Sequence, residues 1–309
     1  MSAQSNAQPK KKSRFAGVDK SLYLMLIPGA IIVAIYSYGP LFGLQIAFKR
    51  YDIVQGIWNS PWIGLTNFKY VMSYPGFWQI VFNTVYIAVL KMIFRYIVPI
   101  VVALLLNEVM NLKFKRIVQT LIYLPHFISW IVICGVLISI LDPTDGAVNE
   151  ILKVFGMEPV YFLGNKSTFR PVLVISDVWK EFGYGTIIYM AALTGIDPTL
   201  YEAATIDRAN RFQKMWYITL PGMAPVIVLT GILGLGSLLS AGFDQIFNLY
   251  NPLVYDVADV LDTLTYRMGL VNAQYDVSTA ISLMTSVINA GLVGISYFIA
   301  YKVAGYRIF

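Results

Sequence analysis

The stretch of sequence that decides the fold runs from Trp78 to Leu106 and reads WQIVFNTVYIAVLKMIFRYIVPIVVALLL. Only two of its residues, Lys91 and Arg95, carry a charge. An α-helix needs about 20 predominantly apolar residues to cross a bilayer core of about 30 Å. The stretch exceeds that length, so it predicts a helix that spans a membrane.

The composition of the whole chain agrees with a membrane protein. Of its 309 residues, 57% are hydrophobic and only 13% are charged, whereas about 25% charged residues is usual in soluble domains. Lys and Arg exceed Asp and Glu by 23 to 17, but they cluster as membrane topology requires, so no nucleic-acid partner is predicted. Cys134 is the only cysteine and His126 the only histidine, which excludes a disulfide or a Cys/His metal site within one chain.

Five further apolar segments approach the length of a span. The first is too long for the core of a cleavable signal peptide, which has about 7–15 residues, so it is expected to be retained. We therefore predict an all-α membrane protein with six transmembrane helices, a basic tail over residues 1–20 and one transmembrane domain over 21–309. The stretches between the spans show no pattern strong enough for a core of their own. The six predicted spans are Ser21–Phe48, Trp78–Leu106, Ile117–Leu141, Pro171–Gly195, Pro221–Phe243 and Thr279–Ala304.

Lys and Arg are unevenly distributed between the two sides of the predicted membrane. With the N-terminus inside, the inner segments hold 13 of them, and the longer outer loops hold only 7. Cytoplasmic loops are enriched in Lys and Arg, so both termini are predicted to lie in the cytoplasm. The inner segments are 1–20, 107–116, 196–220 and 302–309, and the outer loops are 49–77, 142–170 and 244–278.

Charged residues inside two of the predicted spans have two interpretations. Lys91 and Arg95 are four residues apart and so lie on one helix face, and span four carries Asp177, Lys180 and Glu181. A charge at mid-membrane costs about 2.5–3.5 kcal/mol on insertion scales, so these side chains should face protein or water. They either line a polar translocation path for a hydroxyl-rich or anionic solute, or pair across helices for assembly, for example Lys91 with Glu181.

Predicted span five contains a face of small residues, which indicates close helix packing or, less directly, a pore lining. These residues are Gly231, Gly234, Gly236, Ser240 and Gly242.

No source of chemical energy is recognisable in the chain. A phosphate-binding loop needs Gly-x-x-x-x-Gly-Lys-Ser/Thr, and the nearest approach, Gly164 to Ser167, lacks that spacing. A single histidine inside a predicted span gives no nucleophile–base pair. We therefore predict no catalytic residues and no cofactor, and transport would use either an ion gradient or a partner that hydrolyses ATP.

The loop between spans four and five, residues 196–225, is the most informative part of the chain. It begins IDPTLYEAATIDRANRFQKMWYITLP over residues 196–221. Asp197 is a natural N-cap, and Pro198 suits the first position of a short surface helix. A second short helix is expected after Asn210, and Pro221 and Pro225 are expected to mark the entry to span five. The bulky face of this second short helix would hold Phe212, Met215, Trp216 and Tyr217.

This loop resembles the EAA loop of permease subunits of ABC importers. Outside it, Trp62–Phe68 and Phe77–Thr84 resemble sugar permeases, and Gly17–Leu24 resembles the subgroup for oligo- or polysaccharides. The resemblance implies that Glu202 to Ala209 form a coupling helix that docks on a separate ATPase. It therefore implies these coupling residues: Glu202, Ala203, Ala204, Asp207, Arg208, Ala209, Phe212, Ile218 and Pro221.

The same resemblance implies the assembly in which the chain would work. That is a type I importer in a bacterial inner membrane, with this chain as a multi-pass permease beside a second homologous permease. Two ABC ATPase subunits would bind ATP and Mg, and an extracytoplasmic solute-binding protein would deliver a saccharide. A gradient-driven secondary transporter is the alternative, although such proteins show internal repeats and none is visible here.

Position 208 departs from the family pattern, which has glycine there. Glycine adopts a positive φ freely, whereas another residue pays about 1 kcal/mol or more. Either the turn at Arg208 uses ordinary dihedral angles, or the arginine makes a contact that compensates. Our hypothesis is a charge contact with the ATPase.

Overall fold

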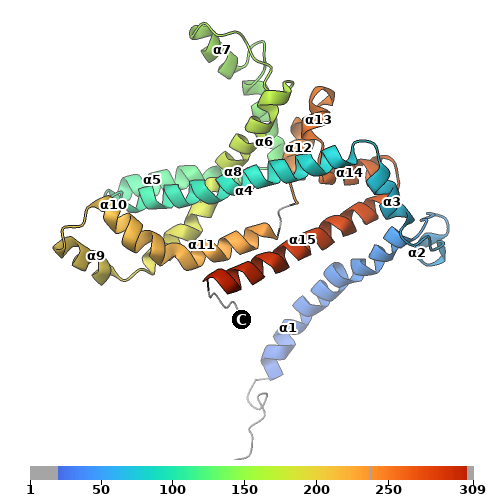
Figure 1. Ribbon diagram of the computed structural model, residues 1–309, viewed down its shortest axis with the longest axis horizontal. Coiled ribbons are helices and arrows are strands. Elements are labelled where there is room, and N and C mark those ends of the chain that lie inside the picture. Colours follow the sequence, from blue (N-terminus) through green and yellow to red (C-terminus); the bar gives the residue numbers. More distant parts are fainter. Residues whose placement is uncertain (1–19, 237–238, 305–309) are drawn as a thin grey trace, which may run out of the picture.

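The computed structural model describes residues 20–236 and 239–304, and it confirms the all-α prediction for them. An isolated antiparallel bridge between Lys49 and Trp62 is their only β pairing. The predicted basic tail, apart from Lys20, lies outside the described residues. Figure 1 shows long helices running side by side, with short helices at the two ends of this bundle and others projecting from one side of it.

The helices fall into long ones that make up the bundle and short ones that connect them. The α-helices are α1 (Lys20–Val33), α2 (Gly56–Asn59), α3 (Thr66–Ser73), α4 (Phe77–Asn107), α5 (Leu112–Tyr123), α6 (Trp130–Ile140), α7 (Ala147–Val154), α8 (Lys166–Thr194), α9 (Pro198–Ile206), α10 (Arg211–Lys214), α11 (Leu220–Leu235), α12 (Phe243–Leu249), α13 (Tyr255–Ala258), α14 (Leu261–Tyr266) and α15 (Tyr275–Ala304). The 3₁₀ segments are η2 (Gly39–Phe48), η3 (Leu124–Phe127) and η5 (Pro252–Val254), and the π segments are η1 (Ala34–Tyr38), η4 (Met215–Thr219) and η6 (Arg267–Val271).

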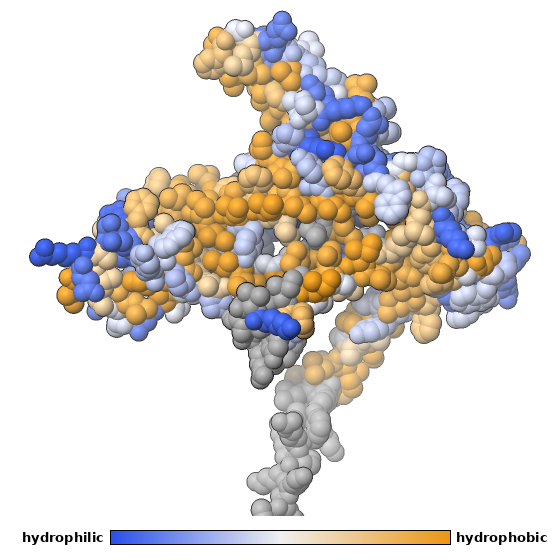
Figure 2. Space-filling view, in the orientation of Figure 1, coloured by the Kyte–Doolittle hydropathy of each residue, from blue (hydrophilic) through white to orange (hydrophobic). Residues whose placement is uncertain are grey.

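The centre of the bundle is the pair α4 and α8, which pack against each other along their length. Helix α11 packs against α8 and α15, and η2 packs against α15. The outer faces of these helices remain apolar and exposed, as the hydrophobic surface along the bundle in Figure 2 shows. Such a continuous apolar surface suits a lipid environment.

Four helical stretches within the described residues are long and apolar enough to cross a membrane, or five if a bent pair counts as one span. They coincide with predicted spans one, two, five and six. The criterion of helix length and apolar composition therefore does not find all six predicted spans. Helix α8 is 29 residues long but is not among them, and it carries Asp177, Lys180 and Glu181. The four stretches are Leu24–Phe48, Phe77–Asn107, Arg211–Leu235 and Tyr275–Ile295.

Predicted span three is not one straight helix. Its two parts, Leu112–Phe127 and Trp130–Ile140, meet at an angle of 101°. Pro125 opens the 3₁₀ turn η3, and the side chain of Ser129 accepts a hydrogen bond from the Val132 N–H, which caps a new helix. A proline and a fresh N-cap explain why one helix ends here and another begins.

Predicted span five begins and ends earlier than expected. The helical stretch runs from Arg211 to Leu235; its regular α-helical part, α11, begins at Leu220 with Pro221 in its first turn, as predicted, and Pro225 lies inside α11. The π segment η4 ends at Thr219, two residues before Pro221; a local change of helical register is a common way to accommodate a proline that cannot donate to the preceding turn. The chain has left the helix before Gly242, which has a φ of +92°.

The predicted outer loop 244–278 contributes to the core, contrary to expectation. Helix α12 packs on α6, α13 on α4 and α8, and α14 on α15 and α4. Ile246, Val254 and Val260 are fully buried in one cluster with Phe169 and Leu173 of α8. Short helices that cannot bury an apolar face alone therefore do so against the long helices.

Candidate functional site

The predicted surface helix forms as α9, at the end of the bundle opposite α2 and α3 (Figure 1). Asp197 is its N-cap and accepts a hydrogen bond of 2.9 Å from the Thr199 N–H, with Pro198 at the first helical position. This hydrogen bond lowers the pKa of the exposed Asp197 carboxyl. The sequence prediction for the start of this helix is confirmed.

Helix α9 ends at a residue in the left-handed conformation, Arg208, with a φ of +56°. The Ala209 N–H donates to the Ala204 carbonyl at 2.9 Å, and the Arg208 N–H donates to the Thr205 carbonyl at 3.1 Å. These two bonds define a Schellman motif, whose left-handed position is usually glycine. The alternative of ordinary dihedral angles at Arg208 is therefore wrong.

Two side-chain hydrogen bonds hold α9 against the helix that follows it. The hydroxyl groups of Tyr201 and Thr219 are 3.0 Å apart, and the Lys214 ammonium donates to the Thr205 hydroxyl at 2.7 Å. The second short helix, α10, begins after Asn210 as predicted. Asn210 and Gln213 cap each other in a capping box.

The predicted coupling residues divide into an exposed helix and a bulky face. Glu202, Ala203, Asp207 and Arg208 are exposed, Ala204, Ala209 and Ile218 are partly exposed, and Pro221 is exposed. Phe212 is 78% exposed and lines an apolar groove of about 520 Å³ with α4 residues. The loop therefore presents a small-residue helix and a large apolar surface that the described residues leave exposed.

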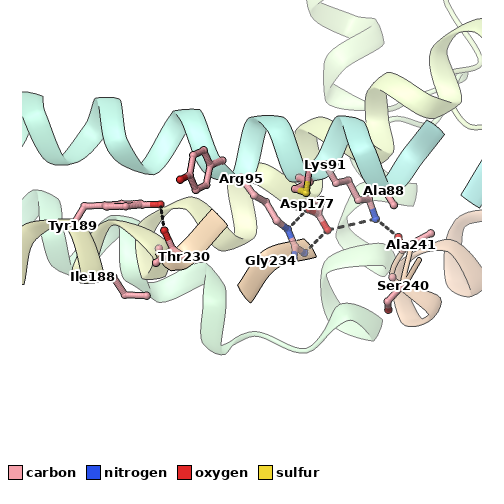
Figure 3. A pocket seen from close by; sticks show the side chains of 14 residues that line it. Ala88, Lys91, Arg95, Asp177, Ile188, Tyr189, Thr230, Gly234, Ser240 and Ala241 are labelled. Carbon is pink, nitrogen blue, oxygen red and sulfur yellow. Dashed lines mark hydrogen bonds and ion pairs between the residues drawn. The ribbon is translucent and has the colours of Figure 1, made fainter. Parts of the chain in front are cut away.

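Lys91 and Arg95 of α4 form an ion-pair cluster with Asp177 of α8, drawn in Figure 3, in which Lys91 and Asp177 are buried and Arg95 is partly exposed. The Asp177 carboxylate accepts two hydrogen bonds from the Arg95 guanidinium, at 2.5 and 2.6 Å. The Lys91 ammonium is 3.4 Å from the same carboxylate. Lys91 therefore pairs with Asp177, and the predicted pairing with Glu181 is wrong.

Lys91 is also bonded to the segment that follows α11. Its ammonium donates to the Ala241 carbonyl at 2.6 Å and to the Gln245 side-chain oxygen at 2.5 Å. A Cβ atom on Gly242 would lie 3.0 Å from the ammonium nitrogen, so glycine keeps this approach open. Gln245 was not predicted as a site residue because it lies in a predicted outer loop. The small residues of predicted span five were the only sequence signal for this contact.

Lys180 and Glu181 make their direct contacts at the bend between α5 and α6, although the Glu181 carboxylate is close enough to Arg95 to interact with it electrostatically. The Lys180 ammonium donates to the His126 carbonyl at 2.6 Å, and the Glu181 carboxylate is 2.8 Å from His126 Nδ1. The bend leaves carbonyl groups without helical partners, and buried ones need a donor. Neither Lys180 nor Glu181 lines the cavity described next.

A cavity of about 400 Å³ opens beside the ion-pair cluster. Lys91, Arg95 and Asp177 are its charged lining residues, and Tyr96, Tyr189 and Thr230 add hydroxyl groups. Gly234, Ser240 and Gly242 of the predicted small-residue face also line it, whereas Gly231 and Gly236 pack closely against Tyr96 and Val293. Close packing is therefore confirmed for Gly231 and Gly236, whereas a pore-lining role for the members that line the cavity stays a prediction.

Comparisons with known proteins agree on one family. Residues 96–305 match the model for the binding-protein-dependent transport system inner membrane component. Protein LplB of Bacillus subtilis is 40% identical over 284 residues, which are 92% of this chain and 89% of the relative. The polygalacturonan/rhamnogalacturonan transport system permease protein YteP of the same organism is 41% identical, over 92% of this chain and 88% of its own.

Solved structures show the same similarity in three dimensions. One is a bacterial ABC transporter involved in the import of the acidic polysaccharide alginate, with a TM-score of 0.86 and 38% identity. The match covers 92% of this chain and 96% of that one. A second structure shows the bacterial alginate ABC transporter in complex with an alginate pentasaccharide-bound periplasmic protein, with a TM-score of 0.85 and 37% identity.

Proposed function

Since the chain belongs to the family of binding-protein-dependent transport system inner membrane components, we propose that it is one transmembrane permease subunit of an ATP-driven importer of oligo- or polysaccharides. Its location is the inner membrane, in which it is an integral component. The observation that carries the proposal is the similarity over nearly the full length to the chain from the alginate importer. A gradient-driven secondary transporter is set aside because the family depends on a binding protein.

The proposed assembly follows from that family. A second homologous permease would complete the translocation path, and an extracytoplasmic binding protein would deliver the saccharide. The structure of the relative with a saccharide-bound periplasmic protein supports such a partner. Two separate ABC ATPase subunits would bind ATP and Mg and hydrolyse the ATP.

The proposed coupling element is α9 with the Schellman turn at Arg208. Its exposed face supports this role, because Ala203 has a small side chain and lets another protein approach the helix backbone. The two hydrogen bonds to the following helix, through Tyr201 and Lys214, would pass a movement of α9 into α11. The exposed arginine would supply a charge contact with the ATPase.

The proposed topology has six spans with both termini in the cytoplasm. Helix α8 and the bent pair α5–α6 would supply the two spans that hydropathy alone does not. The length of α8, at 29 residues, supports this, since a helix rises 1.5 Å per residue. Its charges are satisfied by partners on α4 and at the α5–α6 bend, which removes the main obstacle to placing it in a membrane.

The assembly can be tested by purifying the permease with the products of neighbouring genes. We expect ATPase activity that rises when the binding protein and its saccharide are added. In Ala203→Trp, a large side chain on the exposed face of α9 should prevent capture of the ATPase subunits in a pull-down. Val54→Trp is the matched control, since Val54 is 94% exposed and comes two residues before α2, which lies at the opposite end of the bundle. Equal capture by both variants would contradict docking through α9.

A further inference from the structure

The charged groups that line the cavity beside α4 and α8 do not balance. Two cations, Lys91 and Arg95, face one carboxylate, Asp177. The side chain of Asp177 is 1% exposed, so its charge is fully enclosed by its two partners. The lining side chains therefore carry one net positive charge, and the Glu181 carboxylate, which is not part of the lining, offsets part of it at Arg95.

The two cations differ in what they can still bind. The Lys91 side chain is 6% exposed, and its ammonium is surrounded by Asp177, Ala241 and Gln245. An ammonium has three N–H donors, so Lys91 has no free donor. Its role is to hold α4, α8 and the segment before α12 together.

Arg95 keeps free donors on the cavity side. It meets Asp177 through its Nε and one Nη2 hydrogen, and a guanidinium has five N–H donors in a planar fork. The other three have no partner among the described residues, and the side chain is 45% exposed. A planar pair of N–H groups is suited to a carboxylate.

The remaining lining suits a saccharide ring. Tyr96 and Tyr189 meet edge to face, with ring centroids 6.5 Å apart, and the Tyr189 hydroxyl is 3.0 Å from that of Thr230. Aromatic faces together with hydroxyl groups provide both apolar contact and hydrogen bonding. The volume of about 400 Å³ lies within the usual range for small-molecule sites, about 300–1,000 Å³.

We propose that this cavity is a binding site for acidic sugar units, with the Arg95 guanidinium as the contact for their carboxylate groups. The inference rests on the proposed import of saccharides and adds the class of saccharide, one that carries carboxylates such as uronic acids. Asp177 binds the Nε edge of the guanidinium and leaves its other N–H groups available. The ion pair with Lys91 holds the Asp177 carboxylate in place. Arg95 is thus a specificity-determining residue in the translocation path.

The arrangement makes Arg95 separable from the fold. In Arg95→Gln, Asp177 keeps Lys91 as a partner, so the buried carboxylate is not left without a cation. We expect membrane abundance close to that of the wild type. Arg95→Lys retains the positive charge but not the planar fork, and Arg116→Gln removes an exposed arginine of α5 that lies outside the cavity.

The test is ATP-dependent uptake into proteoliposomes that contain the complete importer with saturating binding protein. The probes are trigalacturonate and its neutral trimethyl ester. Loss of a hydrogen bond to a charged group predicts that Arg95→Gln slows trigalacturonate uptake roughly tenfold or more. Arg95→Lys should fall between Arg95→Gln and the wild type, and Arg116→Gln should equal the wild type.

Three results separate the two proposals. If Arg95→Gln transports trigalacturonate within twofold of the wild type, or slows both probes equally, the carboxylate site is wrong. If the wild type transports only the neutral ester, the acidic class is wrong while saccharide import stands. If neither probe nor any other saccharide is taken up with ATP, the proposed function itself fails, and the inference fails with it.

Discussion

Lys91 and Arg95 lie one turn apart on α4, yet they face different surroundings. Replacing Lys91 by Met would leave the Ala241 carbonyl and the Gln245 oxygen without a donor. An unsatisfied buried polar group costs about 1–3 kcal/mol, so Lys91→Met should lower both the melting temperature and the membrane abundance. Fluorescence-detected size-exclusion chromatography of heated samples measures both. Arg95→Gln is the comparison, and equal stability of the two variants would contradict the assigned role of Lys91.

Arg208 combines an unfavourable backbone conformation with an exposed side chain. Arg208→Gly should stabilise the end of α9 by about 1 kcal/mol, because glycine adopts a positive φ without steric cost. Amide hydrogen exchange across residues 198–209 should therefore slow. The same variant should capture less of the ATPase in a pull-down, whereas Arg208→Lys keeps the charge and should capture the wild-type amount. Unchanged capture by Arg208→Gly would leave the arginine without a special role.

Asp262 of α14 is a half-buried carboxyl group outside the long helices. One of its oxygens, Oδ2, has no hydrogen-bond partner among the described residues. Burial raises the pKa of this carboxyl, and a hydrogen bond from Ala241 and the charge of Lys91 offset part of that effect. A raised pKa in the folded state means that stability is present below the pKa of the unfolded chain and is lost as pH rises through the folded pKa.

The amide in Asp262→Asn cannot ionise, so this variant should lose that dependence on pH. At pH 7–8 it should melt at a higher temperature than the wild type. The difference should shrink as the pH falls toward the ordinary pKa of Asp, about 3.9. Melting curves of the detergent-solubilised protein across this range measure the effect. A constant difference at every pH would indicate a change in packing and not in protonation.

At the scale of elements, local chemistry predicted helix starts better than helix continuity. Asp197 with Pro198 forms the expected cap, and the helix expected after Asn210 begins there, because a cap needs only its own neighbouring residues. The bend at Ser129 was missed because the apolar composition continues across it. The helices of 243–271 were missed because their apolar faces are buried by α4, α6 and α8, which sequence alone does not bring near.

For the candidate site too, local features could be predicted from the sequence, whereas contacts that depend on helix packing could not. The spacing of Lys91 and Arg95 correctly placed both on one face of α4, since helix periodicity is a local property. Their common partner Asp177 was a candidate from its position in an apolar span, but its choice over Glu181 depends on the packing of α4 against α8. The contact of Lys91 with Gln245 depends on a break after α11, and the small residues of predicted span five were its only sequence signal.

The crossing of α5 and α8 depends on one glycine. A Cβ atom on Gly183 would lie 1.8 Å from the Ile122 carbonyl oxygen, which is backbone and cannot rotate away. Gly183→Ala should therefore force the helices apart, at a cost of about 1–3 kcal/mol or more, and lower the melting temperature. Gly135→Ala in α6 meets no atom within 4 Å and should be neutral or stabilising. Similar melting temperatures for both variants would contradict this close crossing.

At the scale of the whole molecule, the proposed topology makes a direct prediction. Cys134 is the only cysteine, so Cys134→Ala provides a background for single-cysteine labelling. In spheroplasts, a maleimide that cannot cross membranes should label Val54→Cys and Asp145→Cys. It should label Lys113→Cys only after lysis. Labelling of Lys113→Cys in intact spheroplasts would contradict six spans with both termini in the cytoplasm.

The contacts of Lys91 also set an order in which the chain can be assembled. Its partners Ala241 and Gln245 come 150 and 154 residues later in the chain, and the Asp177 partner of its neighbour Arg95 comes 82 residues later. During synthesis, α4 is therefore made long before the groups that neutralise it. Until α8 arrives, two cations on α4 must remain near water or be shielded by the insertion machinery. During biogenesis these two cations therefore lack their carboxylate partner until α8 packs against α4. Lys91 lacks its last hydrogen-bond partner until α12 packs into place.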